Sequence, residues 1–184
     1  MKIFVLNLGS TSFKFKLFDF TAGEQVLASG GVESIGSPAG AYQIKFPDSE
    51  EKGGCTCAVH GEAMDLCVGK LIERSVIRSI GDVEAVGYKA VHGGPITGAR
   101  FVDDELMGVM EDFSSFVPAH NPIYLSTMRA LRDKYPKLKQ IAYFETSFHA
   151  TMPEYRAVYG VPYEWYRDYG IRRYGFHGSS HSYI

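Results

Sequence analysis

The stretch "RRYGFHGSSH", residues 172–181, contains residue types that handle anions. It places His177 between Gly175 and Gly178 and follows it with two serines. A glycine turn that opens a helix can direct backbone N–H groups toward an anion. An imidazole beside it can stabilise charge on a transferring phosphoryl group. The alternative interpretation is a glycine turn that precedes a capped helix and binds no ligand.

A second polar cluster lies near the N-terminus, where "NLGSTSFK" interrupts two apolar runs. Hydroxyls, backbone N–H groups around a glycine, and one lysine suit the phosphates of a nucleotide or a Mg²⁺-bound phosphate. The side chains concerned are Asn7, Ser10, Ser12 and Lys14. A polar hairpin tip with no ligand is the common alternative, because turns favour the same residue types.

Two charged residues accompany apolar runs. Glu145 follows the run 139–144, and a carboxylate beyond the end of a strand can bind Mg²⁺ or orient a nucleophile. A surface loop would place the same carboxylate in solvent without a role. Lys89 lies within "AVGYKAV", where burial of a cation is costly unless it meets an anion. That anion is either a substrate carboxylate or an internal Asp or Glu.

Other histidines and cysteines favour structural roles. His92 in "VHGGP" and His120 in "PAHNP" can each be hydrogen-bonded at a turn. The cysteines near His60 lack a standard zinc spacing and read as small apolar residues of a strand and a helix; they are Cys55, Cys57 and Cys67.

Composition limits the class of protein. The 184 residues are 45% hydrophobic and 22% charged, with a net charge of −2, which suits one globular domain. This charge gives no reason to expect nucleic acid or an anionic membrane as a partner. No apolar run reaches the roughly 20 residues of a membrane span, and no signal-peptide pattern follows Lys2. We therefore expect a cytoplasmic protein.

Hydrophobic periodicity predicts two kinds of organisation. The first 60 residues read as an antiparallel meander, with strands expected at 2–9, 13–20, 24–34, 41–46 and 55–60. After them, strands alternate with helices. The helices are expected at 61–77, 103–113 and 121–135, the last with Asn121 as cap, Pro122 in its first turn and Pro136 after its end, and the strands at 82–94 and 139–149. The pattern predicts an α/β fold, a mixed sheet with flanking helices.

Together these stretches resemble the acetokinase family, which contains acetate and propionate kinases. The resemblance is carried, in the family's order across residues 1–184, by "VLNLGSTSFKFKLFD", "AVHGG", "PAHNP", "FETSFHATMP" and "RRYGFHGSSH". It implies a ribonuclease-H-like lobe of the kind found in actin, sugar kinases and heat-shock chaperone ATPases. It also implies phosphoryl transfer between ATP and acetate or another short-chain carboxylate, giving ADP and an acyl phosphate, with Mg²⁺.

The resemblance also assigns roles to residues. Glu145 and His177 are expected to be catalytic, with His177 stabilising the transferring phosphoryl group. The residues expected to bind the substrate are Lys89, Val91, Ala119 and Phe176. Those expected to face the phosphates of ATP or ADP are Ser10, Ser12 and Lys14, and Asn7 is expected to help hold Mg²⁺.

Three positions depart from the family's pattern. Lys89 stands where an arginine is usual, and lysine cannot form a bidentate fork with a carboxylate. Glu145 stands where an aspartate is usual, so its carboxylate lies about 1 Å farther along the side chain, a displacement that matters in a site. Ala119 stands where a larger aliphatic residue is common, which predicts a roomier substrate pocket.

Members of the family are about twice this length. Residues 1–184 are therefore expected to form a single N-terminal lobe, with the C-terminal lobe, which completes the active site, absent. The isolated chain is expected to be inactive, and a homodimer is possible for a full-length form. An alternative is a shortened, diverged binding or regulatory paralogue without catalysis, which Lys89 and Glu145 favour slightly. A sugar kinase of the same fold is disfavoured by "GFHGSSH" and "FETSFH".

Overall fold

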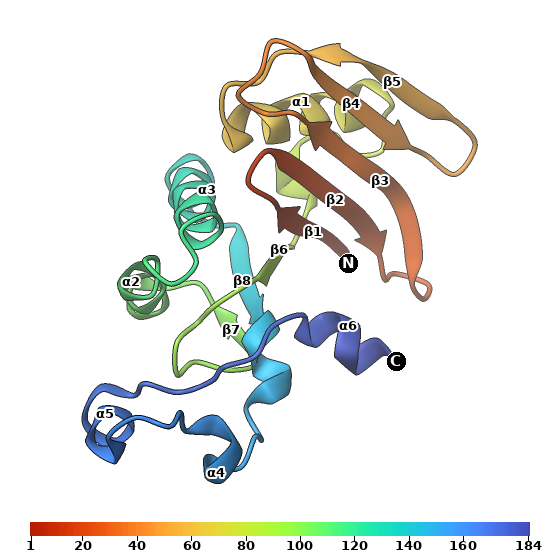
Figure 1. Cartoon of the computed structure of the whole chain (residues 1–184). Helices are drawn as coiled ribbons and strands as arrows, with labels where there is room; N and C mark the ends of the chain where they lie inside the picture. Colours follow the sequence, from red (N-terminus) through yellow and green to blue (C-terminus); the bar gives the residue numbers. More distant parts are fainter.

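The computed structural model describes residues 1–184 and contains one eight-stranded sheet (Figure 1). The strand order is β5-β4-β3-β2-β1-β6-β8-β7. The strands are β1 (Lys2–Leu8), β2 (Ser12–Asp19), β3 (Gln25–Glu33), β4 (Gly40–Lys45), β5 (Glu50–Cys55), β6 (Ala85–Ala90), β7 (Ala99–Phe101) and β8 (Lys139–Phe144). The predicted α/β fold with a mixed sheet and flanking helices is confirmed.

The first five strands form the expected antiparallel meander. In the β1–β2 hairpin, Leu6 lies opposite Phe15, and both are buried. Lys14 and Lys16 alternate with these apolar residues and are exposed. One face of the hairpin therefore packs into the core while the other meets solvent, as the two-residue period predicts.

The other half of the sheet is mainly parallel. β6 pairs in parallel with β1 and with β8, whereas the short β7 pairs antiparallel at the edge. Parallel neighbours end at the same edge of a sheet. The carboxyl ends of β1, β6 and β8 therefore come together, and this edge is where α/β proteins place their sites.

Three helices pack on one face of the sheet (Figure 1): α1 (His60–Glu73), α2 (Asp104–Asp112) and α3 (Asn121–Lys134). Between them and the sheet lies a cluster of 31 buried residues. The short α6 (Gly178–Tyr183) contacts η2 (Glu145–His149), the 3₁₀ turn that follows β8. None of the helices is both long and apolar enough to cross a membrane.

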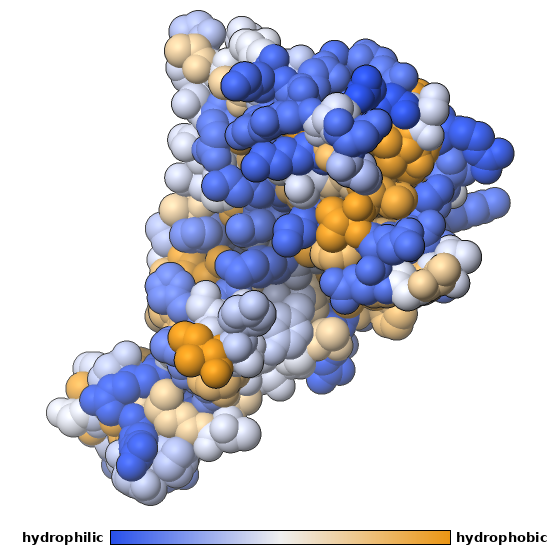
Figure 2. Space-filling view, turned by 90° about the vertical axis from the view of Figure 1, so that its right-hand side faces the viewer, coloured by the Kyte–Doolittle hydropathy of each residue, from blue (hydrophilic) through white to orange (hydrophobic).

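The segment after η2 projects from the sheet. It carries α4 (Glu154–Ala157) and α5 (Tyr163–Tyr169), which form the protrusion at the bottom of Figures 1 and 2. No residue of α5 is buried. Its aromatic residues are therefore largely exposed, unlike the aromatic residues of β1 and β2.

Some local predictions were wrong. The strand expected at 55–60 lies instead at Glu50–Cys55, a charged and glycine-rich edge strand. Asn121 does not cap α3: it lies inside the first turn, is fully buried, and His120 holds the cap position. The predicted strand at 82–94 is shorter, Ala85–Ala90, because an η1 turn at Ile80–Asp82 precedes it.

Candidate active site

A pocket of about 420 Å³ opens at the edge where β1, β6 and β8 end. Most of the residues singled out from the sequence line it: Asn7, Lys89, Val91, Ala119, Glu145, Phe176 and His177. They come from five separate parts of the chain. The pocket thus combines a cation, a carboxylate, an imidazole, an amide and an apolar wall.

Glu145 and Lys89, which both line this pocket, form an ion pair. The Lys89 Nζ lies 3.2 Å from the Glu145 Oε1, and the glutamate side chain is only 5% exposed. Ser179 donates a hydrogen bond from its Oγ to Glu145 Oε1 at 2.5 Å. Glu145 is therefore not a loose surface carboxylate, and the anion that meets Lys89 in this structure is internal.

The pKa of Glu145 reflects opposing influences. Burial raises the pKa, but hydrogen bonds from Ser179 and Lys89, together with the lysine charge, outweigh it and hold the pKa below its usual value. The carboxyl is therefore ionised at neutral pH. Lys89 remains 40% exposed and has three N–H donors, so it can contact a second anion in the pocket while paired with Glu145.

His177, which also lines the pocket, lies in a strained backbone position. Its φ of 57° is in the left-handed region, which non-glycine residues rarely adopt. It occupies the position just before α6, and its carbonyl accepts from the backbone N–H groups of Ser180 and His181. Strain of this kind concentrates at functional sites, where surrounding contacts enforce it. The exposed imidazole faces a pocket that also holds Lys89 and Glu145.

Apolar residues form another wall of the pocket. Val91 directly follows β6. Phe176, which is 43% exposed, lies in the segment just before α6. Ala119 lies just before α3, beside Val117 and Pro118, and its small side chain leaves room in this wall. The arrangement can hold a short alkyl group next to a cation.

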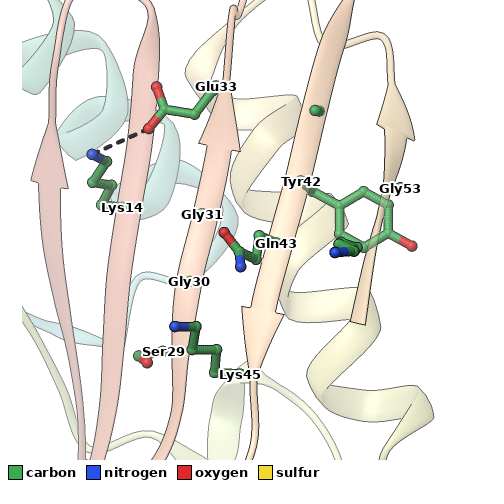
Figure 3. Close-up of a pocket in the computed structure, with 11 residues that line it drawn as sticks. Lys14, Ser29, Gly30, Gly31, Glu33, Tyr42, Gln43, Lys45 and Gly53 are labelled. Atoms are coloured by element: carbon green, nitrogen blue, oxygen red, sulfur yellow. Dashed lines mark ion pairs between the residues drawn. The ribbon is translucent and has the colours of Figure 1, made fainter. Parts of the chain in front are cut away.

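Three predicted phosphate-binding residues lie outside this pocket. Ser10 borders a groove between α1 and α3 of about 560 Å³, and Ser12 lines none of the larger pockets. Lys14 lies on the outer face of the sheet, 3.1 Å from Glu33, and lines a different pocket of about 730 Å³ (Figure 3). Lys14 lies directly opposite Asn7 in the β1–β2 pairing, but neither Lys14 nor the two serines line the pocket around Glu145.

The sequence profile of the acetokinase family matches residues 2–184. The chain belongs to this family. It is 41% identical to acetate kinase from Parabacteroides distasonis over 190 residues, covering 100% of this chain and 47% of that protein. Acetate kinase from Bacteroides thetaiotaomicron is also 41% identical, over 192 residues, with 100% and 47% covered.

Solved structures agree with this assignment. Porphyromonas gingivalis acetate kinase matches with a TM-score of 0.87 and 34% identity over 98% of this chain and 46% of that one. A propionate kinase from Francisella tularensis matches with a TM-score of 0.88 and 30% identity over 99% and 46%. The chain thus spans about half the length of the relatives it matches. The family and the partial length expected from the sequence are confirmed.

Oxygen donors for a hard cation are few in this acetokinase-family chain. No group of three or more His, Cys, Asp or Glu side chains is placed to hold a metal. The Asn7 amide and the Glu145 carboxylate line the same pocket, and both offer oxygen atoms of the kind that Mg²⁺ prefers. Mg²⁺ usually keeps several waters and binds substrate phosphates. The residues present therefore fit a partial Mg²⁺ site.

His92 and His60 are structural histidines of different kinds. His92 is buried, accepts a hydrogen bond at Nδ1 from the Gly94 N–H, and stacks on Phe113. Burial lowers its pKa, so it is neutral. His60 has a positioning role that the sequence did not reveal. Its Nε2 lies 2.8 Å from the Gly9 carbonyl oxygen. A carbonyl only accepts, so Nε2 carries a hydrogen and ties α1 to the β1–β2 tip.

The His60→Ala substitution should loosen this hairpin tip. One neutral hydrogen bond is worth about 1 kcal/mol, so opening of the tip becomes about fivefold more frequent. Hydrogen exchange of the Gly9 and Ile35 amides, which bond to Ser12 and Thr11, reports this directly. The matched control is His149→Ala, which removes a similar bond to the Phe176 carbonyl. Unchanged exchange at Gly9 and Ile35 in His60→Ala would contradict the role.

Proposed function

We propose that residues 1–184 form the N-terminal lobe of an acetate kinase-type phosphotransferase. The supporting observation is the convergence of Lys89, Glu145 and His177 with an apolar wall in one pocket. Acetate and propionate kinases are the relatives of this chain. The proposed substrates are ATP and acetate or another short-chain carboxylate. The C-terminal lobe of such an enzyme completes the site.

The pocket suits an acid whose alkyl end is short. The methyl group lies against Val91, Ala119 and Phe176, while the Lys89 ammonium, through N–H donors not used by Glu145, binds the substrate carboxylate. Lysine binds as a point charge, without the two-point fork of arginine. Since the substrate carboxylate is ionised at neutral pH, the nucleophile needs no general base.

In the proposed reaction, a carboxylate oxygen attacks the γ-phosphorus of ATP. A new P–O bond forms as the bond to the bridging oxygen breaks, and ADP leaves with that oxygen. Charge spreads over the three equatorial oxygens of the transferring group, and His177 donates a hydrogen bond to one of them. Asn7 and Glu145 contribute oxygen atoms toward Mg²⁺, which supplies charge neutralisation when bound. The backbone N–H groups of the β1–β2 tip lie beside Asn7 and suit a phosphate.

A chimera tests this proposal. Residues 1–184 joined to the C-terminal half of the Parabacteroides distasonis enzyme should form hydroxylamine-trappable acyl phosphate from ATP and acetate, whereas residues 1–184 alone should form none. His177→Ala should lower the chimera's rate at least about 100-fold, the usual scale for losing a group that stabilises transition-state charge. Propionate and butyrate, assayed beside acetate, test the room left by Ala119.

Two results would contradict the proposal. A folded chimera without acyl phosphate formation would favour the non-catalytic paralogue, and acyl phosphate formation by residues 1–184 alone would contradict the requirement for a second lobe. Phosphorylation of a sugar in place of a carboxylate would assign a different substrate class.

A further inference from the structure

Strands β1 and β6 separate just before the pocket. Their parallel pairing runs from Ile3 opposite Ala85 to Leu6 opposite Tyr88. Both strands continue for two residues beyond this point, to Leu8 and Ala90. In the same register Leu8 would lie opposite Ala90, and a parallel ladder would then join the Leu8 N–H to the carbonyl of the preceding residue, Lys89.

The Tyr124 hydroxyl occupies the place of that missing ladder bond. It accepts a hydrogen bond from the Leu8 N–H at 3.0 Å and donates one to the Lys89 carbonyl at 2.5 Å. The side chain comes from α3 and is fully buried. One backbone-to-backbone bond is thus replaced by two bonds through an inserted oxygen, so both the Leu8 N–H and the Lys89 carbonyl keep a partner at the split.

The separated strand ends form two walls of the pocket. Asn7, Leu8 and Gly9 line it from the β1 side, and Lys89 and Val91 line it from the β6 side. The hydroxyl lies between the two walls. Closing the split would move Asn7 toward Lys89 and narrow the space between them.

Several contacts fix the phenol in place. In the same first turn of α3, the Asn121 Nδ2 donates to the carbonyls of His92 and Met110, which anchors the helix start. The Tyr88 ring meets the Tyr124 ring edge to face at 6.2 Å between centroids. Burial raises the pKa of Tyr124 to about 12, so the hydroxyl keeps the proton that it donates to Lys89.

We propose that Tyr124 is a positioning residue whose hydroxyl acts as a spacer between β1 and β6. It sets the separation of Asn7 and Lys89 and thereby the geometry in which the pocket receives a carboxylate. The part of this proposal that concerns the ligand rests on the proposed function. The spacer role itself concerns only the protein.

The test is Tyr124→Phe in the 184-residue chain, which keeps the ring and removes the inserted oxygen. The matched control is Tyr88→Phe, which also removes a buried hydroxyl bond, from Tyr88 to Gln140 Oε1 at 2.6 Å, without touching the split. Tyr88→Phe should lose stability, because Gln140 Oε1 loses its hydrogen-bond donor, whereas closure of the split should recover part of the loss in Tyr124→Phe. Only Tyr124→Phe should form a direct Leu8 N–H to Lys89 carbonyl bond, visible as NMR coupling across that bond or in a crystal structure.

Acetate titration followed by NMR provides the second readout. Acetate should bind at least about tenfold more weakly to Tyr124→Phe, because displacements near 1 Å in a site carry costs of this order or more. Tyr88→Phe should bind as the parent does. A split that keeps its width, with water in place of the hydroxyl, would overturn the spacer role, and a closed split with unchanged acetate affinity would overturn its effect on the pocket. The separation of β1 and β6 is measured without ligand, so it tests the spacer role independently of acetate binding. Failure of the parent chain to bind acetate would count against the proposed function and not against the spacer role.

Discussion

Lys89→Met should destabilise the chain by about 2 kcal/mol at neutral pH and raise the pKa of Glu145. The substitution keeps the length of the side chain but leaves a buried carboxylate without its cation. Breaking a buried pair from one side costs about 3–5 kcal/mol, and the half-exposed position of Lys89 reduces this figure. The hydrogen bonds from Ser179 remain, yet they no longer outweigh burial.

The effect depends on pH in a direction that identifies its cause. In the parent chain the folded-state pKa of Glu145 lies below the ordinary 4.5, so its contribution is full above that value and is lost as the pH falls through the folded pKa. In Lys89→Met we expect the folded pKa to lie above the unfolded one, because burial raises it and the lysine no longer opposes that effect. The deficit of the variant is therefore largest at neutral pH. It begins to shrink as the pH falls through the raised pKa of the variant, above 4.5, and it shrinks further below 4.5 as the parent chain loses its own contribution.

Urea unfolding between pH 3.5 and pH 7.5, at roughly half-unit steps, with an NMR titration of Glu145 measures both effects. Lys14→Met is the control, because the Lys14–Glu33 pair has similar geometry but both side chains are 59% exposed. It should change stability little. The double substitution Lys89→Met with Glu145→Gln should recover part of the loss. An equal deficit at every pH would show that lost packing, not an unpaired carboxylate, causes the destabilisation.

The antiparallel half of the fold could be predicted because its strands show a clear two-residue hydrophobic period and pair with strands that are adjacent in the sequence. Phe13, Phe15 and Leu17 alternate with lysines, and the hairpin brings them against β1 without distant partners. The strand β5 escaped prediction because an edge strand needs only one neighbour and tolerates charge and glycine. Its apolar signal is accordingly weak, and the adjacent "CTCAVH" resembled a strand more closely.

Much of the candidate site could also be anticipated, since Lys89 interrupts an apolar run, Glu145 ends one, and His177 lies in a stretch rich in glycine and serine. Tyr124 could not be found in this way, because it reads as one more residue of the buried stripe of a helix. Its hydroxyl partners, Leu8 and Lys89, lie 116 and 35 residues away in the sequence. His60, likewise, bonds to a carbonyl 51 residues away. Local patterns contain no information on such contacts.

Gly178→Ala should separate α6 from η2 and disturb the site around Glu145. A Cβ at this position would lie 2.0 Å from the Glu145 carbonyl oxygen and 2.7 Å from the Phe148 Cβ, so either α6 or the 3₁₀ turn must move. Overpacking of this kind costs about 1–3 kcal/mol. The movement also weakens the bond from Ser179 to Glu145, so the pKa of Glu145 should rise.

Gly108→Ala is the matched control for this substitution. Gly108 lies in α2, is exposed, and would have nothing within 4 Å of an added Cβ. Alanine should therefore stabilise α2 by about 0.5–1 kcal/mol through its higher helix propensity. Hydrogen exchange of the Ser180 and His181 amides, which bond to the His177 carbonyl, separates the two cases. Exchange should accelerate in Gly178→Ala alone. The close packing of Gly178 against Glu145 is expected to hold α6, and with it His177, near the carboxylate. This expectation would be contradicted if α6 remained docked in Gly178→Ala and both variants gained stability.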